Sequence, residues 1–284
     1  MEALSEHIFI EDQYPGVTLG VVSHSRGLIQ IDAPPAPEDS RSWRAALMGL
    51  SSGPDRILIN LDSHPDRTLG ARAMDCSVIA HEKTAQAFRN RPSTFKAQGD
   101  DTGASWEAIS GLTGIRWVTA EISFTHSMTM HSDNTSILLE SHPGPNQGAI
   151  WVIFPEEKIV FVGDAVLKNQ PPFLANADIP AWLETLALLQ SKTYRDYTVV
   201  SGRGGVVNTV LIKSQVVFLK EALKKIEKLS AKKQAADMIE GLIQPLLLNF
   251  KAPAARQKQY AQRLRYGLKH YYAKHYQSAD NSEK

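Results

Sequence analysis

The chain has 284 residues, 43% of them hydrophobic, and its 31 basic side chains nearly balance its 30 acidic ones. This balance excludes a protein that attracts nucleic acid or an anionic membrane by overall charge, and no apolar run is long enough for a membrane span. The length is typical of one main domain with a substantial core. The N-terminus is acidic where a secretory signal would be basic, so we expect a cytoplasmic protein.

The first part of the chain predicts short strands, then helices and strands in alternation. Runs rich in β-branched residues predict an antiparallel meander, and apolar residues at helical spacing predict a helix after a Pro-rich turn. The alternation that follows is typical of a layered α/β sheet. The expected strands are 7–10, 18–23, 27–31, 56–61 and 77–80, and the expected helices are 40–50, 69–74 and one starting near residue 82.

The middle of the chain, 90–114, is rich in polar residues and predicts a loop or lid with a short helix near Trp106. After it, strands and then helices are expected again. Two strand-rich halves that each close with helices predict a pseudo-symmetric sandwich. The expected strands are 122–130, 135–141, 148–154, 159–162 and 197–201, and the expected helices are 179–191 and most of the chain from 211 onward.

Three regions are predicted: a main domain over 1–210, a helical extension over 211–276 that packs on it, and a disordered tail over 277–284. The segment 254–276 mixes basic residues with five tyrosines, a combination found in nucleic-acid contacts. The neutral net charge favours instead an amphipathic helix that packs its tyrosines on the domain or on a second subunit. We therefore expect no nucleic-acid and no membrane partner, and a homo-oligomer stays open.

Closely spaced polar residues follow the strand expected at 56–61. Asp62, His64 and Asp66 alternate, so a strand leaving its sheet can direct all three toward one point, as a metal cage requires. The carboxyl end of a strand is also where α/β proteins usually place ligands. The same residues could be solvated caps of the helix that follows. The motif alone leaves both interpretations open.

Two later strands also end in residues that can bind a metal. His142 follows the strand expected at 135–141 and precedes a Pro-Gly turn, and Asp164 follows Gly163 after the strand expected at 159–162. In this order the segments resemble the metallo-β-lactamase superfamily, whose usual pattern is His-x-His-x-Asp-His, a later His, a Gly-Asp pair and a final Gly-His-Gly. The resemblance runs from about residue 7 to 207. It implies an α/β fold whose four layers form an αββα sandwich, here with C-terminal helices added.

The chain departs from that pattern at three histidine positions. Asp62 stands where the first motif histidine would be, Arg67 where the third would be, and Arg203 where the last would be. Because arginine stays protonated and offers no lone pair, the second metal site of the family is expected to be lost. Asp32, which ends the strand at 27–31, is expected to support the motif loop from behind. The resemblance implies one remaining set of metal ligands, namely Asp62, His64, His142 and Asp164.

This set predicts a hydrolase with one divalent metal ion, zinc in first place and iron or manganese as alternatives. The ion would activate a water molecule against an ester, thioester, lactone or phosphoester of a small-molecule substrate, which can be anionic. Asp66 would accept the proton, and Arg67 or Arg203 would stabilise the developing negative charge.

The alternative is a metal-free pseudoenzyme. Its two guanidiniums would fill the volume of the lost ion, pair with Asp66 and Asp164, and bind an anionic ligand through Arg67 and Arg203. In the simplest form of this alternative, the carboxylates and the arginines only neutralise one another in a salt-bridge cluster.

Overall fold

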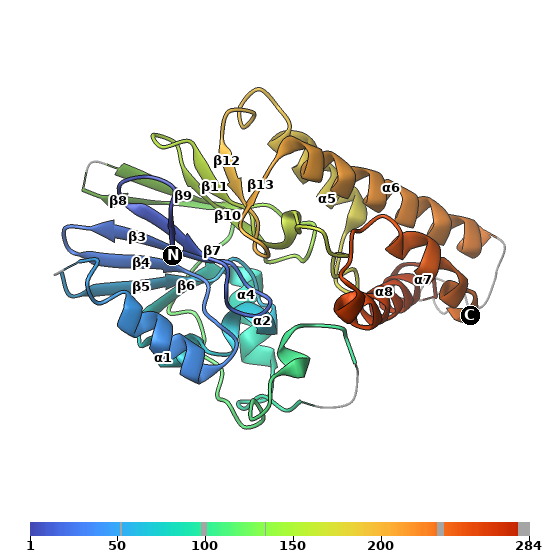
Figure 1. The fold of residues 1–284 in the computed structure, drawn as a ribbon, viewed down its shortest axis with the longest axis horizontal. Helices are drawn as coiled ribbons and strands as arrows, with labels where there is room; N and C mark the ends of the chain where they lie inside the picture. Colours follow the sequence, from blue (N-terminus) through green and yellow to red (C-terminus); the bar gives the residue numbers. More distant parts are fainter. Residues whose placement is uncertain (52, 98–100, 134, 232–235, 278–284) are drawn as a thin grey trace.

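The protein is an αββα sandwich, as the sequence predicts. The computed structural model describes residues 1–284 except 52, 98–100, 134, 232–235 and 278–284. Two β-sheets lie face to face, and helices cover their outer faces (Figure 1). Of the tail predicted to be disordered, only Gln277 lies among the described residues.

In the described residues, the first sheet has seven strands in the order β1-β2-β3-β4-β5-β6-β7. The predicted antiparallel meander is confirmed, and β4 to β7 are parallel. Parallel neighbours bring their carboxyl ends to one edge of the sheet, which prepares a site there. The strands are β1 (Glu2–Ala3), β2 (Ile8–Glu11), β3 (Leu19–His24), β4 (Gly27–Ile31), β5 (Asp55–Ile59), β6 (Ser77–His81) and β7 (Ile122–Phe124).

The second sheet has the order β13-β12-β11-β10-β9-β8 and is antiparallel except between β11 and β12. The single strand expected at 122–130 is wrong: the chain turns at the exposed Thr125 and His126 and passes from one sheet to the other. The residue pattern continues through this turn and gives no sign of it. The strands are β8 (Ser127–Ser132), β9 (Thr135–Ser141), β10 (Ile150–Phe154), β11 (Ile159–Phe161), β12 (Thr198–Val200) and β13 (Val206–Val207).

Two of the expected helices differ from prediction. The helix expected at 40–50 begins at Pro37, because proline is favoured in the first turn of a helix. The helix expected at 69–74 begins only at Ala71, and a separate short helix over Pro65–Thr68, which was not predicted, precedes it. The helices are α1 (Pro37–Ala46), α2 (Pro65–Thr68), α3 (Ala71–Met74), α4 (Glu82–Asn90), α5 (Ile179–Leu189), α6 (Thr209–Ala231), α7 (Glu240–Leu247) and α8 (Gln257–Tyr272), with short 3₁₀ turns at Trp106–Ala108, Gly163–Ala165, Ala236–Ile239 and Ala254–Arg256 and a π-helical turn at Ala273–Gln277.

Buried apolar residues fill the spaces between the layers. Trp43 of α1 and Met74 of α3 cover the outer face of the first sheet, and Ile31 and Phe161 lie between the two sheets. The hydrophobic effect of this burial supplies most of the driving force for folding.

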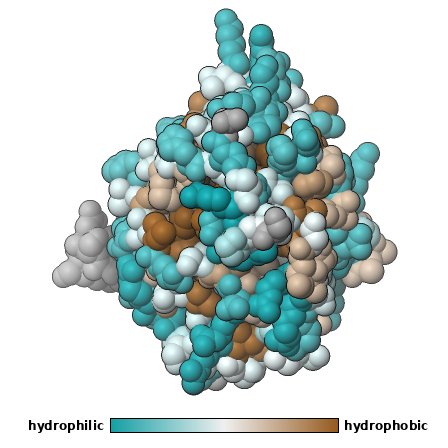
Figure 2. Space-filling view, turned by 90° about the vertical axis from the view of Figure 1, so that its left-hand side faces the viewer, coloured by the Kyte–Doolittle hydropathy of each residue, from teal (hydrophilic) through white to brown (hydrophobic). Residues whose placement is uncertain are grey.

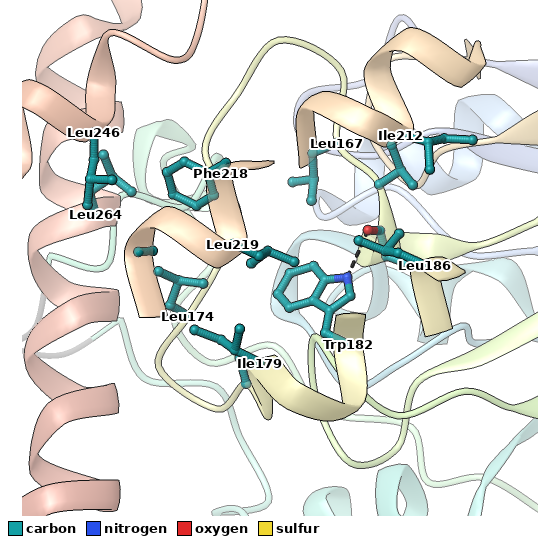
Figure 3. Close-up of a cluster of buried hydrophobic side chains, with 14 of the residues drawn as sticks. Leu167, Leu174, Ile179, Trp182, Leu186, Ile212, Phe218, Leu219, Leu246 and Leu264 are labelled. Atoms are coloured by element: carbon teal, nitrogen blue, oxygen red, sulfur yellow. Dashed lines mark hydrogen bonds between the residues drawn. The ribbon is translucent and has the colours of Figure 1, made fainter. Parts of the chain in front are cut away.

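The third buried cluster joins the second sheet to the C-terminal helices. Trp182 of α5 lies at its centre, and its Nε1 donates a 2.9 Å hydrogen bond to the carbonyl of Ala165 (Figure 3). Phe218 of α6 and Leu264 of α8 are fully buried in the same cluster. The extension expected at 211–276 therefore packs on the sandwich, while the boundary at 210 stays a prediction. The predicted tyrosine packing is confirmed in α8, where Tyr260, Tyr271 and Tyr272 are buried.

The N-terminus of α5 carries a side-chain cap. Asp178 Oδ1 accepts a 3.0 Å hydrogen bond from the backbone N–H of Ala181. We expect Asp178→Ala to lower the free energy of unfolding by about 1 kcal/mol, because the cap is lost. Asp178→Asn, which keeps an accepting oxygen, should stay within a few tenths of a kcal/mol of wild type. Chemical denaturation checks both values, and equal losses in the two variants would contradict the capping role.

The outer surface is largely polar on the side opposite the C-terminal helices. Figure 2 shows this face with hydrophilic residues spread over it and apolar residues in small separate groups. In the part of the chain that the structure describes, no helix has both the length and the apolar composition needed to cross a membrane.

Candidate functional site

Strand ends from both sheets converge on one buried cluster. Asp32 follows β4, Asp62 follows β5, and α2 begins directly after His64. From the second sheet, Asp164 follows β11 and Arg203 follows β12. We call the set Asp32, Asp62, His64, Asp66, Arg67, Asp164 and Arg203 the salt-bridge cluster.

Arg67 lies at the bottom of the cluster and is completely buried. Its Nη1 donates a 2.8 Å hydrogen bond to Asp32 Oδ2, and its Nη2 donates to Asp164 Oδ1. Its Nε lies 3.1 Å from Asp62 Oδ1, an ion pair without hydrogen-bond geometry. One guanidinium thus contacts three carboxylates, two of which the sequence predicted as metal ligands.

Arg203 closes the cluster from the other side and is 1% exposed. Its Nε and Nη2 hold the two oxygens of Asp164 at 2.9 and 3.1 Å in a bidentate pair. Its Nη1 donates to Asp66 Oδ2, and its Nη2 lies 3.1 Å from His64 Nδ1. The predicted pairing of guanidiniums with Asp66 and Asp164 is therefore present, and Arg203 makes it with both.

Asp32 and Asp66 each bind backbone N–H groups in addition to an arginine. Asp32 Oδ1 accepts a 2.9 Å hydrogen bond from Leu61, so it holds the motif loop from behind. Asp66 accepts from the backbone of Ser105 and Trp106. No oxygen of Asp66 is left without a donor, which does not suit the predicted role of proton acceptor. The catalytic roles assigned to Asp66, Arg67 and Arg203 stay predictions.

The electrostatics follow from burial and these pairs. Burial alone would raise the pKa of Asp66 and of Asp164, but the surrounding charges and hydrogen bonds, those of Arg203 foremost, together outweigh it and lower both pKa values. Burial raises the pKa of Asp62, and that of Asp32 to about 7. With every carboxyl ionised, four aspartates against two arginines leave an excess of two negative charges in the cluster.

His64 is held as a neutral ring. Its Nδ1 accepts a 3.1 Å hydrogen bond from the backbone N–H of Asp66 and faces Arg203 Nη2, so this nitrogen must carry a lone pair. Burial and then Arg203 lower the pKa of His64 to about 3. The helix-capping role that the sequence left open for this motif is real for His64, which caps α2.

His142 does not join the cluster. Its Nε2 lies 3.1 Å from Glu140 Oε2, and its ring stacks on Trp151 with centroids 3.8 Å apart. In the structure as described, no hydrogen bond or ion pair links His142 to Asp62, His64 or Asp164. The convergence of all four predicted metal ligands is thus not found.

As arranged, these residues do not fit a metal ion. Within the described ranges, no group of three His, Cys, Asp or Glu side chains has the geometry to hold one. The backbone is shaped for a guanidinium instead, since a Cβ at Gly202 would lie 2.8 Å from Arg67 Nη2. The metal-ligand roles of Asp62, His64, His142 and Asp164 stay predictions that the present geometry does not support.

A pocket of about 180 Å³ opens beside the cluster. His64, Asp164 and Phe173 are among the residues that line it, and α8 contributes Arg263. The segment 101–106, part of the region predicted as a loop or lid, connects the salt-bridge cluster to α8. Its backbone N–H groups donate hydrogen bonds to Asp66, and the side chains of Gln259 and Arg263 of α8 donate to its carbonyls.

Sequence reasoning missed Arg263 and Arg91, both of which line this pocket. Arg263 carried a readable signal, because it lies three residues after Tyr260 and four before Gly267, on the buried stripe of α8. Arginine is rarely fully buried without a binding partner, so an arginine on that stripe indicates a specific role. Arg91, just after α4, gave no comparable signal.

No family model and no curated protein matches the chain. Several solved structures do. A metallo-β-lactamase from Pontibacter korlensis is 18% identical with a TM-score of 0.60, and the match covers 76% of this chain and 96% of that one. A metallo-β-lactamase from Erythrobacter litoralis is 16% identical with a TM-score of 0.56, over 78% and 95%. A double mutant of the sec-alkyl sulfatase PisA1 is 14% identical with a TM-score of 0.62, over 95% and 49%.

The chain has the metallo-β-lactamase fold. At these identities the likeness establishes the fold alone. Matches to the two lactamases cover about three quarters of the chain, whereas the match to the sulfatase, of which this chain spans about half, covers nearly all of it. The metallo-β-lactamase fold therefore accounts for the sandwich.

Proposed function

We propose that this metallo-β-lactamase-fold protein works without a metal ion and binds a small anionic molecule in the pocket beside the salt-bridge cluster, without hydrolysing it. The observation that carries the proposal is the occupation of the old metal centre by Arg67 and Arg203, which together contact all four aspartates and His64. A buried cluster of this kind is a rigid structural element rather than a reactive one.

The sequence suggested that Arg67 and Arg203 bind the anion, but in this proposal neither of them does. Neither side chain lines the pocket, and the carboxylates of the cluster already neutralise both. An incoming anion would have to displace an aspartate that is buried and hydrogen-bonded, at a cost of several kcal/mol. The positive charge for the ligand must come from elsewhere in the pocket wall.

A hydrolase with one divalent metal ion, zinc or else iron or manganese, is the second candidate. The observation in its favour is the excess of carboxylates, since four aspartates face two arginines in the cluster. A divalent cation would neutralise that excess if the guanidiniums moved away. Retention of about one metal ion per chain, lost on Asp164→Asn, would establish this candidate.

Metal removal tests the proposal. We expect protein purified without chelators to hold far less than one equivalent of zinc, iron or manganese, and we expect EDTA to leave its melting temperature unchanged. A structural or catalytic ion would be coupled to folding, so its removal would lower the melting temperature. Hydrolysis of activated esters, lactones or phosphoesters should stay at the rate measured without protein, with or without added zinc. Metal-dependent turnover would contradict the proposal.

A further inference from the structure

Arg263 is a buried cation with no carboxylate in contact. It is 1% exposed, and in the described ranges no Asp or Glu oxygen lies within ion-pair distance of it. Its Nε donates a 3.0 Å hydrogen bond to the carbonyl of Gly103, and its Nη1 donates to Gln170 and to Pro171. No described residue accepts from its Nη2, which is also buried. Neutral acceptors therefore fix the plane of the guanidinium and leave its charge unpaired.

This arrangement is costly unless something else compensates for it. A buried, unpaired charge costs several kcal/mol, and a buried donor without a partner adds to that cost. The ring of Phe173, whose centroid lies 4.0 Å from the guanidinium carbon, offsets part of the cost by a cation–π contact. Burial and the nearby Arg203 lower the pKa of Arg263 to about 9, so the group still carries its charge at neutral pH.

A second arginine without a carboxylate partner lines the same pocket. Arg91 lies over the ring of Trp117, 4.7 Å from its centroid, and its Nη1 is buried without an acceptor among the described residues. Its planar group is therefore also positioned by an aromatic face rather than by an acid. The pocket wall thus offers two preorganised cations, which lie far apart in the sequence, to a ligand.

We propose that the pocket binds a small organic oxyanion, with Arg263 as its principal counter-ion and Arg91 as the second cation. Guanidinium groups suit carboxylate, sulfate and phosphate oxygens because they donate in a planar fork. Trp106, Phe173 and Leu174 supply the apolar wall for the rest of the ligand, and Asn146 offers an amide. The inference rests on the proposed function and identifies the ligand class and the residues that bind it.

The size of the pocket limits the ligand. Its volume is about 180 Å³, and an apolar cavity of about 150 Å³ is large enough to take a benzene molecule. One aromatic ring or a short aliphatic chain with a single anionic head therefore fits, whereas a polymer or a nucleotide does not. Benzoate, phenyl phosphate and phenyl sulfate are suitable probes, and benzamide is their neutral counterpart.

Isothermal titration calorimetry at fixed ionic strength tests the site on the full chain. We expect at least one of the three anions to bind with a stoichiometry of one, and benzamide to bind at least about tenfold more weakly, because charge-assisted hydrogen bonds are stronger than neutral ones. The preferred anion then distinguishes a planar carboxylate head from a tetrahedral one. Failure of all three anions to bind, or equal binding of benzamide, would overturn the inference.

Two variants and a matched control assign the binding to these arginines. Arg263→Gln should weaken binding of the preferred anion at least about tenfold, and Arg91→Gln several-fold. Arg265→Gln, on the same helix but paired with Glu240 on the surface, should bind as wild type does. If Arg263→Gln fails to fold, Arg91→Gln decides alone, since its side chain makes no hydrogen bond to a described residue. Unchanged affinity in the folded variants would overturn the inference.

The outcomes separate this site from the proposed function. A chain that holds one metal ion, yet loses anion binding on Arg263→Gln, would overturn the proposed function and support the arginine site. A metal-free chain that binds none of the three anions would overturn the arginine site alone.

Discussion

Replacing Arg67 with methionine should lower the free energy of unfolding by about 3–5 kcal/mol, the usual cost of leaving buried charges without a partner. Methionine has a similar length but supplies neither charge nor donors, so Asp32, Asp62 and Asp164 would all lose their contact with the buried guanidinium. The loss is a large part of the stability of an ordinary domain. Urea denaturation followed by circular dichroism measures it.

The matched control is Arg265→Met. Arg265 makes a bidentate pair with Glu240 at 2.7 and 2.6 Å, but on the surface, so its loss should cost less than about 1 kcal/mol. Adding Asp62→Asn to the Arg67→Met variant should recover part of the lost stability, because Asp62 then no longer carries a buried charge without its arginine, whereas Asp164 keeps its bidentate pair with Arg203. Equal losses for Arg67→Met and Arg265→Met would show that the cluster does not hold the fold together.

The second large effect is a loss of stability in mild acid caused by His64. The pKa of His64 is about 3 in the folded protein because burial and Arg203 disfavour the charged ring, whereas an unfolded chain has a histidine pKa near 6.5. Between these values the unfolded chain binds a proton that the folded protein does not. The contribution of His64 to stability is therefore fully present above about pH 6.5 and falls by about 1.4 kcal/mol per pH unit below it, or about 2 kcal/mol at pH 5. The raised pKa of Asp32 acts in the opposite direction over the same range, so only a comparison with a His64 variant shows the effect of His64.

Comparison with His64→Asn isolates this contribution. Asparagine can still cap α2, but it does not titrate, so its free energy of unfolding should fall less than that of wild type between pH 8 and pH 5. His270→Asn, at an exposed position on α8, should follow the wild-type profile. Parallel profiles for wild type and His64→Asn would mean that His64 is not held neutral in the folded protein.

The sandwich could be predicted because its signals are local. Alternating runs of strand and helix formers, together with turn residues, predicted the meander, the alternation of strands and helices that follows it, and the C-terminal helices. The break at Thr125 was missed because the crossing between sheets depends on long-range pairing, which the pattern of neighbouring residues does not record. The start of α1 at Pro37 was misplaced because the same prolines suit both a turn and a first helical turn.

The part of the site that depends only on the position of the backbone could be predicted. Strand ends had to bring Asp62, Asp164 and Arg203 to one edge, and they do. Whether the other predicted residues join the cluster depends on the direction of their side chains. His142 stands at its expected place in the chain but stacks on Trp151 and pairs with Glu140, and no spacing rule could predict that.

The role of Arg263 could not be predicted from the sequence either. Its α8 was predicted as an amphipathic helix, but its role depends on a contact with the loop at 101–104, some 160 residues earlier in the chain. Such contacts form only after the sandwich and the extension have packed, so they are a property of the tertiary structure rather than of any segment.

The measurement that tests the central claim most directly is a crystal structure of the full chain soaked in zinc, with anomalous data collected at the zinc edge. We predict no anomalous peak among Asp62, His64 and Asp164, and density for the guanidiniums of Arg67 and Arg203 on the carboxylates that they contact here. A peak about 2.0–2.2 Å from His64 and Asp164, the usual distance for zinc ligands, with either guanidinium displaced, would contradict the account.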